Sequence, residues 1–424
     1  MLPPRRVAVP VVLGVVATAY GWWRVPVAAR NRLWAEDGRV FLSDALAGVP
    51  PWSSYDGYLH LVPRLLAEAI VAVIPPARYD LATTAVSVAT VGLVCALTYL
   101  LTEDLLDRVA VRCLVALVPV LLPAAGFELL GNLANLHGFG LWLGFWLVLH
   151  RPRTRSAAAW WAVAGLLIGL SEIVVVLLVP LLVVGWRDRE RWLPRGALLA
   201  GGLAQVVVSR VQPRPPRGGD GWSPADLALG FAGQAGSAAW TDTGGLAARI
   251  VEIAGATGLL VLLVPPALAL AVLLRHGDAR HRALAGGLLL TSALVWAVSV
   301  VLNFDSWMSF GAWEPQQWRA VGLLRYATTS GLFLCALPVV ALDLVRVRWQ
   351  RALAVGVGVV VLGAGLATGR SHGVARESGE AWPTTQELVS RCAGRPAGSI
   401  SVPIAPPRHP WVATIPCRSV VGGP

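Results

Sequence analysis

Apolar stretches of nearly membrane-spanning length recur along the chain from Val7 to Ala367, and short polar turns separate them. A helix that crosses a bilayer needs about 20 predominantly apolar residues. The pattern predicts about eleven spans, at residues 7–23, 79–101, 109–125, 138–150, 157–170, 173–186, 196–210, 245–274, 283–303, 326–345 and 352–368. We therefore expect an all-α fold, a polytopic transmembrane helix bundle.

The arginines predict how this bundle is oriented. Alternate turns between the expected spans carry a clear excess of Arg, whereas the other connections are close to neutral. Arg-rich short loops stay in the cytoplasm, so we expect a cytoplasmic N-terminus and an extracytoplasmic C-terminus. Arg5 and Arg6 before an apolar run that ends in Ala17-Thr18-Ala19 also fit a cleavable signal peptide, and either reading leaves the next loop outside.

Composition supports a membrane protein and excludes two other classes. Of the 424 residues, 56% are hydrophobic and 14% are charged, and the mean hydropathy is +0.63; a soluble domain carries about 25% charged residues. The net charge of +11 is dispersed between apolar stretches, not clustered as a nucleic-acid binder requires. All 35 basic residues are Arg, a bias that indicates a GC-rich, bacterial source. The apolar composition and the recurring spans, not this bias, predict a location in the cell membrane.

Four outer segments break the apolar pattern, at 24–78, 211–244, 304–325 and 369–424. The first is too long for a simple turn, and within it residues 38–46 and 59–74 have the mixed spacing of helices that lie along a membrane surface. We therefore divide the chain into a transmembrane domain, 1–368, with a long first extracytoplasmic loop, and a small extracytoplasmic tail, 369–424.

The five cysteines fall into two sets. Cys95, Cys113 and Cys335 lie in apolar spans, where cysteine usually serves as a small packing residue. Cys392 and Cys417 lie in the tail, where an oxidising compartment favours a disulfide. Only His409 stands between them, so they match no zinc-binding pattern.

The first loop contains the most chemically informative residues. Glu36 and Asp37 are adjacent in WAEDGRVF, just after the first span, and Asp56 follows in YDGYLHLVPRL. Carboxylates near a membrane need water, a cation or a chemical task. One can act as a general base on a hydroxyl, and a neighbour can help to hold a divalent metal. A solvated loop or a helix cap is the alternative.

This layout resembles the GT-C superfamily of integral-membrane glycosyltransferases, which have many transmembrane helices and an acidic pair early in a long first loop. The resemblance covers the chain to about residue 370. It implies transfer of a sugar from a polyprenyl-phosphate donor to a cell-envelope acceptor, a glycan or lipid, at the extracytoplasmic face. It also implies that Asp37 is the catalytic base and that Glu36 assists it, or that both bind Mg²⁺ or Mn²⁺. Asp44 competes for the same role.

Other polar residues fit substrate binding. Arg64 and Arg325 are candidates for the donor phosphate, because a guanidinium can bind phosphate oxygens in pairs; snorkelling is the alternative for Arg325. Asp56, His60 and Tyr326 are further candidates for substrate binding. Sugar hydroxyls could be bound by Asn132, Asn135 and His137, which lie at the outer end of a span beside Trp142. Local hydrogen bonding and an interfacial belt explain the same residues.

Several acids and tryptophans near the outer span ends complete the candidates. Glu128, Glu172 and Glu252 could line the same cavity, and Trp307, Trp313 and Trp318 suit either the membrane interface or acceptor docking. Patterns of ATPases, zincins and serine hydrolases do not occur in the sequence. The alternatives to an enzyme are a transporter or flippase of lipid-linked saccharides and a non-catalytic envelope assembly protein.

Overall fold

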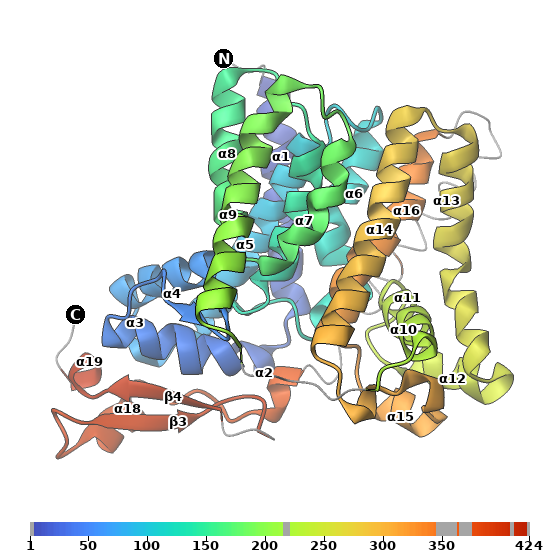
Figure 1. The fold of residues 1–424 in the computed structure, drawn as a ribbon. Coiled ribbons are helices and arrows are strands. Elements are labelled where there is room, and N and C mark those ends of the chain that lie inside the picture. Colours follow the sequence, from blue (N-terminus) through green and yellow to red (C-terminus); the bar gives the residue numbers. More distant parts are fainter. Residues whose placement is uncertain (1–3, 215–220, 345–362, 364–374, 408–410, 422–424) are drawn as a thin grey trace.

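The protein is mostly helical, and its long helices run side by side in one bundle (Figure 1). The computed structural model describes residues 4–214, 221–344, 363, 375–407 and 411–421. The span expected at 352–368 lies, except for residue 363, outside the described residues. The longer helices of the bundle are α1 (Pro4–Arg24), α5 (Tyr79–Leu101), α6 (Val109–Leu121), α7 (Leu136–Leu149), α8 (Arg155–Gly169), α9 (Trp192–Val211), α13 (Val264–His276), α14 (Ala279–Leu302) and α16 (Arg325–Ala341).

Among the described residues, four helical stretches are long and apolar enough to cross a membrane. They are Pro76–Leu101, Ala256–His276, Ala279–Leu302 and Arg325–Leu344, and three shorter apolar helices accompany them. The Arg325–Leu344 stretch is 83% buried in its most apolar window, whereas the Ala256–His276 stretch is only 28% buried. The first therefore lies at the centre of the bundle, and the second presents most of its apolar surface outward, as a lipid-facing helix would.

Two expected spans have a different local structure. Most of the span expected at 173–186 is a 3₁₀ helix, η4 (Ile173–Val183), in which Pro180 and β-branched valines disfavour the α form. Because a 3₁₀ helix rises about 2.0 Å per residue, these residues reach further than an α-helix of the same length would. The expected span at 245–274 is divided at Gly255 into α12 (Gly245–Ala254) and a stretch of η7 (Ala256–Leu263) followed by α13.

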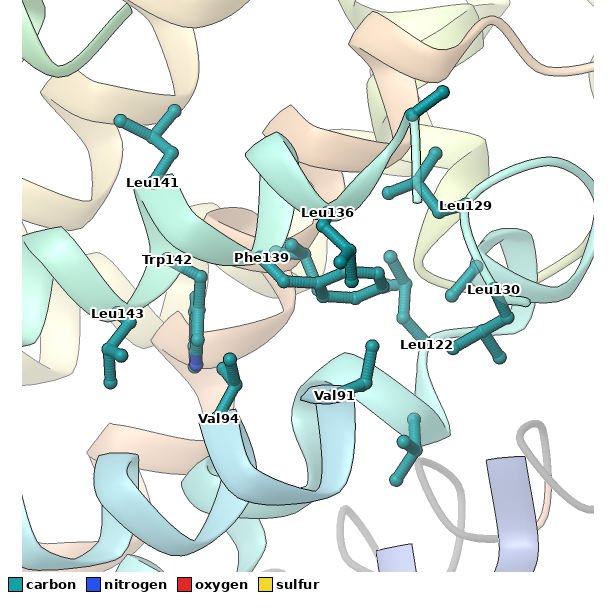
Figure 2. Close-up of a cluster of buried hydrophobic side chains, with 14 of the residues drawn as sticks. Val91, Val94, Leu122, Leu129, Leu130, Leu136, Phe139, Leu141, Trp142 and Leu143 are labelled. Atoms are coloured by element: carbon teal, nitrogen blue, oxygen red, sulfur yellow. The ribbon is translucent and has the colours of Figure 1, made fainter. Parts of the chain in front are cut away.

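The hydrophobic core centres on α7, whose sequence LHGFGLWLGFWLVL is apolar on every side. A helix with that pattern is buried all round, and nearly every residue of α7 is buried. Figure 2 shows Phe139 and Trp142 of this helix beside Val91 and Val94 of α5. The indole N–H of Trp142 donates a hydrogen bond to Thr98 in α5, so its one polar atom is satisfied.

The first loop contains the two expected surface helices and a hairpin. Its elements are α2 (Val27–Arg30), the π-helix η1 (Asp37–Leu42), α3 (Ser43–Ala47), β1 (Ser54–Tyr55), β2 (Tyr58–Leu59), α4 (Leu61–Val73) and η2 (Pro76–Arg78). Residues 38–46 and 59–74 are thus largely helical, close to the sequence-based expectation. The antiparallel β1–β2 hairpin turns at Asp56 and Gly57, both with positive φ, as an Asp-Gly hairpin turn requires.

The later outer segments form short helices at the same end of the bundle as the first loop (Figure 1). In 211–244 and 304–325 they are α10 (Pro224–Gly230), the π-helix η6 (Phe231–Ala235), α11 (Gly236–Ala238), η8 (Ser306–Met308), η9 (Phe310–Ala312) and α15 (Pro315–Ala320). A further short helix, η3 (Pro123–Gly126), follows α6. Trp313 and Trp318 are buried in a second hydrophobic core with Trp296 and Phe310. These two tryptophans therefore serve packing in this structure.

The tail is a small disulfide-bonded unit. It consists of η11 (Ala375–Ser378), α18 (Thr385–Cys392), the antiparallel strands β3 (Ser399–Pro403) and β4 (Val412–Pro416), and α19 (Arg418–Val421). Cys392 is bonded to Cys417, the pair that the sequence pattern favours. The two strands make the tail a local departure from the all-α expectation.

The tail packs against the first loop. Ala35 donates a backbone hydrogen bond to Ala405 (2.6 Å), and Ala405 donates one to Leu33 (3.1 Å). The Ser43 hydroxyl accepts from the backbone N–H of Thr414. These contacts hold the segment that contains Glu36 and Asp37 between the bundle and the tail.

The opposite end of the bundle contains the Arg-bearing turns, and ion pairs join them. Arg280 pairs with Asp107 at 3.0 Å, and Arg153 pairs with Glu103 at 2.9 Å. A shorter helix, η5 (Arg189–Arg191), precedes α9, and η10 (Leu342–Leu344) follows α16 at this end. The two ends of the bundle therefore differ in character, with Arg-bearing turns at one and the first loop and tail at the other.

Candidate functional site

A cavity of about 140 Å³ opens where the first loop meets α7, η4, α14 and α16. Glu36, Asp56, His60, His137, Arg325 and Tyr326, all candidates from the sequence, line it together. The other lining residues are Phe41, Tyr55, Tyr58, Ala134, Leu141, Glu172, Ile173, Val174, Arg214, Val295, Val298, Ser299, Leu302, Asn303 and Thr329. Residues far apart in sequence thus meet at one polar chamber with an apolar side.

The acidic pair is split between the cavity and the protein interior. Glu36 lines the cavity, and its Oε2 atom is buried without a hydrogen-bond partner among the described residues. Asp37 begins the π-helix η1, is fully buried, and is not among the lining residues. π-helical turns are rare and often occur at functional sites; here the turn leaves two adjacent carboxylates in different surroundings.

Asp37 binds the backbone of the loop that leads into α7. Its Oδ1 accepts a hydrogen bond from the N–H of Ala134 at 2.8 Å, and its Oδ2 accepts from the N–H of Leu133 at 3.2 Å. Burial raises the pKa of Asp37 to about 7, although the Ala134 hydrogen bond and the nearby charge of Arg376 oppose the rise. Both carboxylate oxygens are therefore already engaged by the protein.

Arg376, from the tail, binds the same loop from another side. Its side chain is buried and donates to the carbonyl of Gly131 at 2.6 Å. Burial lowers its pKa to about 10, and the charge of Asp37 opposes that shift. The loop before α7 is thus held by Asp37 of the first loop and Arg376 of the tail.

The β1–β2 hairpin covers one side of the cavity. Asp56 at its turn forms an ion pair with Arg214, with 3.2 Å between the Asp56 Oδ2 and Arg214 Nε atoms. The side-chain amide of Gln205 in α9 pairs with both backbone polar groups of Leu59, at 2.7 and 3.0 Å. The hairpin is therefore fastened to α9 and to the residues that follow it.

His60 lies in an aromatic enclosure at the cavity wall. Its ring centroid is 4.1 Å from that of Tyr58, 5.7 Å from Phe41 and 5.9 Å from Tyr55. Neither ring nitrogen makes a well-formed hydrogen bond within the described ranges. Burial lowers the pKa of His60 to about 3, and the charges of His137 and Arg64 lower it further. The ring of a neutral His60 can donate one hydrogen bond to a ligand and accept another from a ligand hydroxyl.

His137 and Glu172 form a second polar pair in the cavity. His137 lies in the first turn of α7, and its Nδ1 atom is 2.5 Å from Oε2 of Glu172. The other oxygen of Glu172 accepts from the N–H of Val174 at 2.7 Å and so caps η4. Both residues line the chamber, as the sequence suggested for His137 and for Glu172.

Arg325 supplies positive charge where α16 begins. Its guanidinium lies over the ring of Tyr326, 5.4 Å from the ring centroid. Among the described residues no carboxylate lies within ion-pair distance of it, although Glu36 and Glu128 are close enough to interact electrostatically. Beside it, Val295, Val298 and Leu302 of α14 form the apolar side of the cavity.

Other sequence candidates lie elsewhere. Arg64 is buried and pairs with Asp44 at 2.8 Å, outside the lining residues. Asn135 precedes α7, and its side-chain amide donates to the Glu128 carbonyl at 3.1 Å, so it supports the loop beside the cavity. Glu252 pairs with Arg319 at the surface. Glu128 is buried near the chamber, and burial raises its pKa.

The described residues show no side-chain cluster that fits a cation. The carboxylates of Glu36 and Asp37 have different surroundings, and both oxygens of Asp37 accept backbone hydrogen bonds. Within the described part of the chain, no group of three His, Cys, Asp or Glu side chains is placed to hold a metal. Because this arrangement does not fit a cation shared by the acidic pair, we derive no chemical step through a metal.

Sequence reasoning did not identify three residues that shape the site, namely Tyr58, Arg214 and Arg376. The Asp-Gly dipeptide at 56–57 signals a hairpin and could have placed Tyr58 on a strand. Arg214 and Arg376 lie in stretches without regular apolar spacing, and only the folded chain shows what they contact.

Comparison with known proteins gives no further guidance. No protein-family model, curated protein or solved structure matches this chain.

Proposed function

We propose that this protein is a GT-C-like glycosyltransferase with about eleven membrane spans. In this proposal it transfers a sugar from a polyprenyl-phosphate donor to a glycan or lipid of the cell envelope at the extracytoplasmic face. The observation that carries the proposal is the composition of the cavity. Within the described part of the chain, one chamber combines a carboxylate oxygen that has no hydrogen bond (Glu36 Oε2), a guanidinium without an ion pair, two histidines, tyrosines and an apolar wall.

The phosphate and the polyprenyl chain of the donor would each bind a different part of this chamber. A phosphodiester needs a cation that is not held in an ion pair, and Arg325 has no ion-pair partner among the described residues. A polyprenyl chain needs an apolar surface continuous with the membrane, and the α14 side chains Val295, Val298 and Leu302 offer one. Leu302 is 63% exposed, so this wall reaches the outside of the bundle.

The acceptor proton goes to Glu36 in this mechanism. Glu36 faces the cavity, and its buried Oε2 makes no hydrogen bond within the described ranges, so it can accept one from a hydroxyl. Asp37 is the other candidate for the base, but its oxygens hold Leu133 and Ala134. We assign Asp37 the role of positioning the loop before α7, and Glu36 the role of the base.

Purified protein in lipid nanodiscs tests this function. The donors would be citronellyl phosphates of mannose, glucose, galactose and arabinose, and the acceptors short cell-envelope oligosaccharides. We expect transfer from one donor, with inversion at the sugar carbon. Glu36→Gln should lower the transfer rate by about 10²- to 10⁴-fold, the usual effect of losing a general base. Glu68→Gln, in α4 of the same segment but not at the cavity, is the matched control and should retain the rate.

Two results would contradict the proposal. If Glu36→Gln retains full transfer while the fold is intact, the base assignment is wrong. If the wild-type protein moves lipid-linked saccharides across vesicle membranes and transfers none of the sugars, the protein is a flippase and the glycosyltransferase proposal fails.

A further inference from the structure

The His137–Glu172 pair has the geometry of a proton-transfer dyad. Glu172 is held at both oxygens, one by the N–H of Val174 at 2.7 Å and one by His137 Nδ1 at 2.5 Å. Its side chain is 3% exposed, whereas that of His137 is 23% exposed. A fixed carboxylate at Nδ1 sets the tautomer and orientation of an imidazole.

The other ring nitrogen of His137 remains available to a ligand. Within the described residues Nε2 makes no hydrogen bond, and it is not among the buried polar atoms that lack a partner. Because His137 lines the cavity, this nitrogen is accessible from it. The ring can therefore carry a proton at Nε2 and release it to a bound molecule without moving.

We propose that His137 is a catalytic acid that protonates the departing phosphate and that Glu172 is its positioning residue. This inference rests on the proposed function and goes beyond it, because that function assigns only the base. It divides the proton transfers between two groups on the cavity wall: Glu36, which accepts a proton, and His137, which donates one.

The charge on the donor shows why an acid is useful. A sugar–phosphate–prenyl diester carries one negative charge, and its leaving group carries two if no proton arrives. The C1–O bond breaks with its electron pair moving to the phosphate oxygen, and that oxygen takes the proton from His137 Nε2. The acceptor oxygen forms the new bond to C1, and its proton goes to Glu36. The products are the glycoside and a prenyl phosphate monoanion, and proton exchange with water restores both residues.

The surrounding charges suit this division. Arg325 lies near enough to Glu128 and Glu36 to interact with both electrostatically. His137 likewise interacts electrostatically with Glu128 and His60. The Arg214 side chain is already paired with Asp56 on the hairpin. A phosphate bound between Arg325 and His137 would therefore meet one fixed cation and one proton donor.

Chemical rescue separates the two groups. His137→Ala should lower kcat by about 10²- to 10⁴-fold, with a KM change below 10-fold. Added imidazole should restore part of that rate, and formate should not. Glu36→Ala should show the reverse, rescue by formate and none by imidazole. Glu172→Gln should lower kcat by a smaller factor, and Glu172→Asp should recover part of the loss. An unchanged kcat in His137→Ala, or rescue of this variant by formate alone, would overturn the inference.

A second measurement keeps the inference independent of the sugar. Geranyl phosphate, a product analogue, would be titrated into protein with ¹⁵N-labelled histidine, and the spectra of wild type and His137→Gln compared to assign the His137 signals. We expect the ligand to shift the Nε2–H signal of His137 and Glu172→Gln to reduce that shift. Binding without any change at His137 would refute the dyad even if sugar transfer succeeds. If the shift occurs but none of the sugars is transferred, the proposed function fails while the phosphate contact stands.

Discussion

Glu36 and Asp37 are neighbours in sequence, yet their carboxylates have different environments. The turn into the π-helix η1 leaves Glu36 at the cavity and buries Asp37 against the backbone of Leu133 and Ala134. The sequence could identify the acidic pair because two carboxylates beside a span are unusual. It could not tell which of the two faces the cavity, because that depends on a loop almost 100 residues further along the chain.

The burial of Asp37 predicts a pH dependence of stability. Its pKa rises from 3.8 to about 7 on folding, so between those values the folded protein holds a proton that the unfolded chain releases. Its contribution to the free energy of unfolding is therefore greatest below pH 4 and falls as pH rises toward 7, by at most about 1.4 kcal/mol per pH unit. Asp37→Asn should remove this decline.

Thermal unfolding of the detergent-solubilised protein at pH 4.5, 6 and 8 measures the effect. As pH rises, the melting temperature of Asp37→Asn should increase relative to that of the wild-type protein. Glu36→Gln controls for the loss of a carboxylate in the same segment. A constant difference across the pH range would show that Asp37 is ionised throughout.

At the scale of elements, periodicity located helices better than it identified their type. It placed the surface helices near residues 38–46 and 59–74 and most of the bundle helices. It did not distinguish a 3₁₀ helix from an α-helix at Ile173–Val183, because an apolar run buries its surface in either form. The β1–β2 hairpin was missed because two-residue strands are too short to show alternation, although Asp56-Gly57 gave the turn signal.

Gly57 offers a test of how the hairpin is fastened. Gly57 and Gly48 both have positive φ, at 85° and 74°. A Cβ on Gly57 would come within 2.9 Å of the Arg214 backbone nitrogen, whereas a Cβ on Gly48 would meet no atom within 4 Å. Gly48→Ala should cost about 1–2 kcal/mol for the left-handed backbone alone, and Gly57→Ala should cost more.

Limited proteolysis and melting temperature of the two variants provide the measurement. We expect faster cleavage near the hairpin in Gly57→Ala than in Gly48→Ala. Equal behaviour of both variants would mean that the close approach of Arg214 contributes nothing to holding the hairpin.

At the scale of the whole molecule, the tail, the first loop and the cavity share one end of the bundle. Arg376 reaches from the tail to Gly131, and Trp382 donates backbone and indole hydrogen bonds to Asn31 and Pro76, at 2.7 and 2.8 Å. Hydropathy could separate the tail from the spans, and its cysteines suggested the disulfide. The contact between the tail and the first loop could not be predicted from the sequence, because backbone hydrogen bonds such as those of Ala405 do not depend on the type of side chain.

The two ends of the bundle lead to a prediction about orientation in the membrane. Arg-bearing turns occupy the end opposite the tail, and the positive-inside rule predicts that this end faces the cytoplasm. Ser399 is exposed on β3 of the tail, and Arg153 is 53% exposed at the Arg-bearing end. In a background with Cys113, Cys392 and Cys417 replaced by serine, a membrane-impermeant thiol reagent should label Ser399→Cys in intact cells. Arg153→Cys should react only after the cells are permeabilised. The reverse pattern would place the cavity on the cytoplasmic side. The proposed sugar transfer at the extracytoplasmic face would then be wrong.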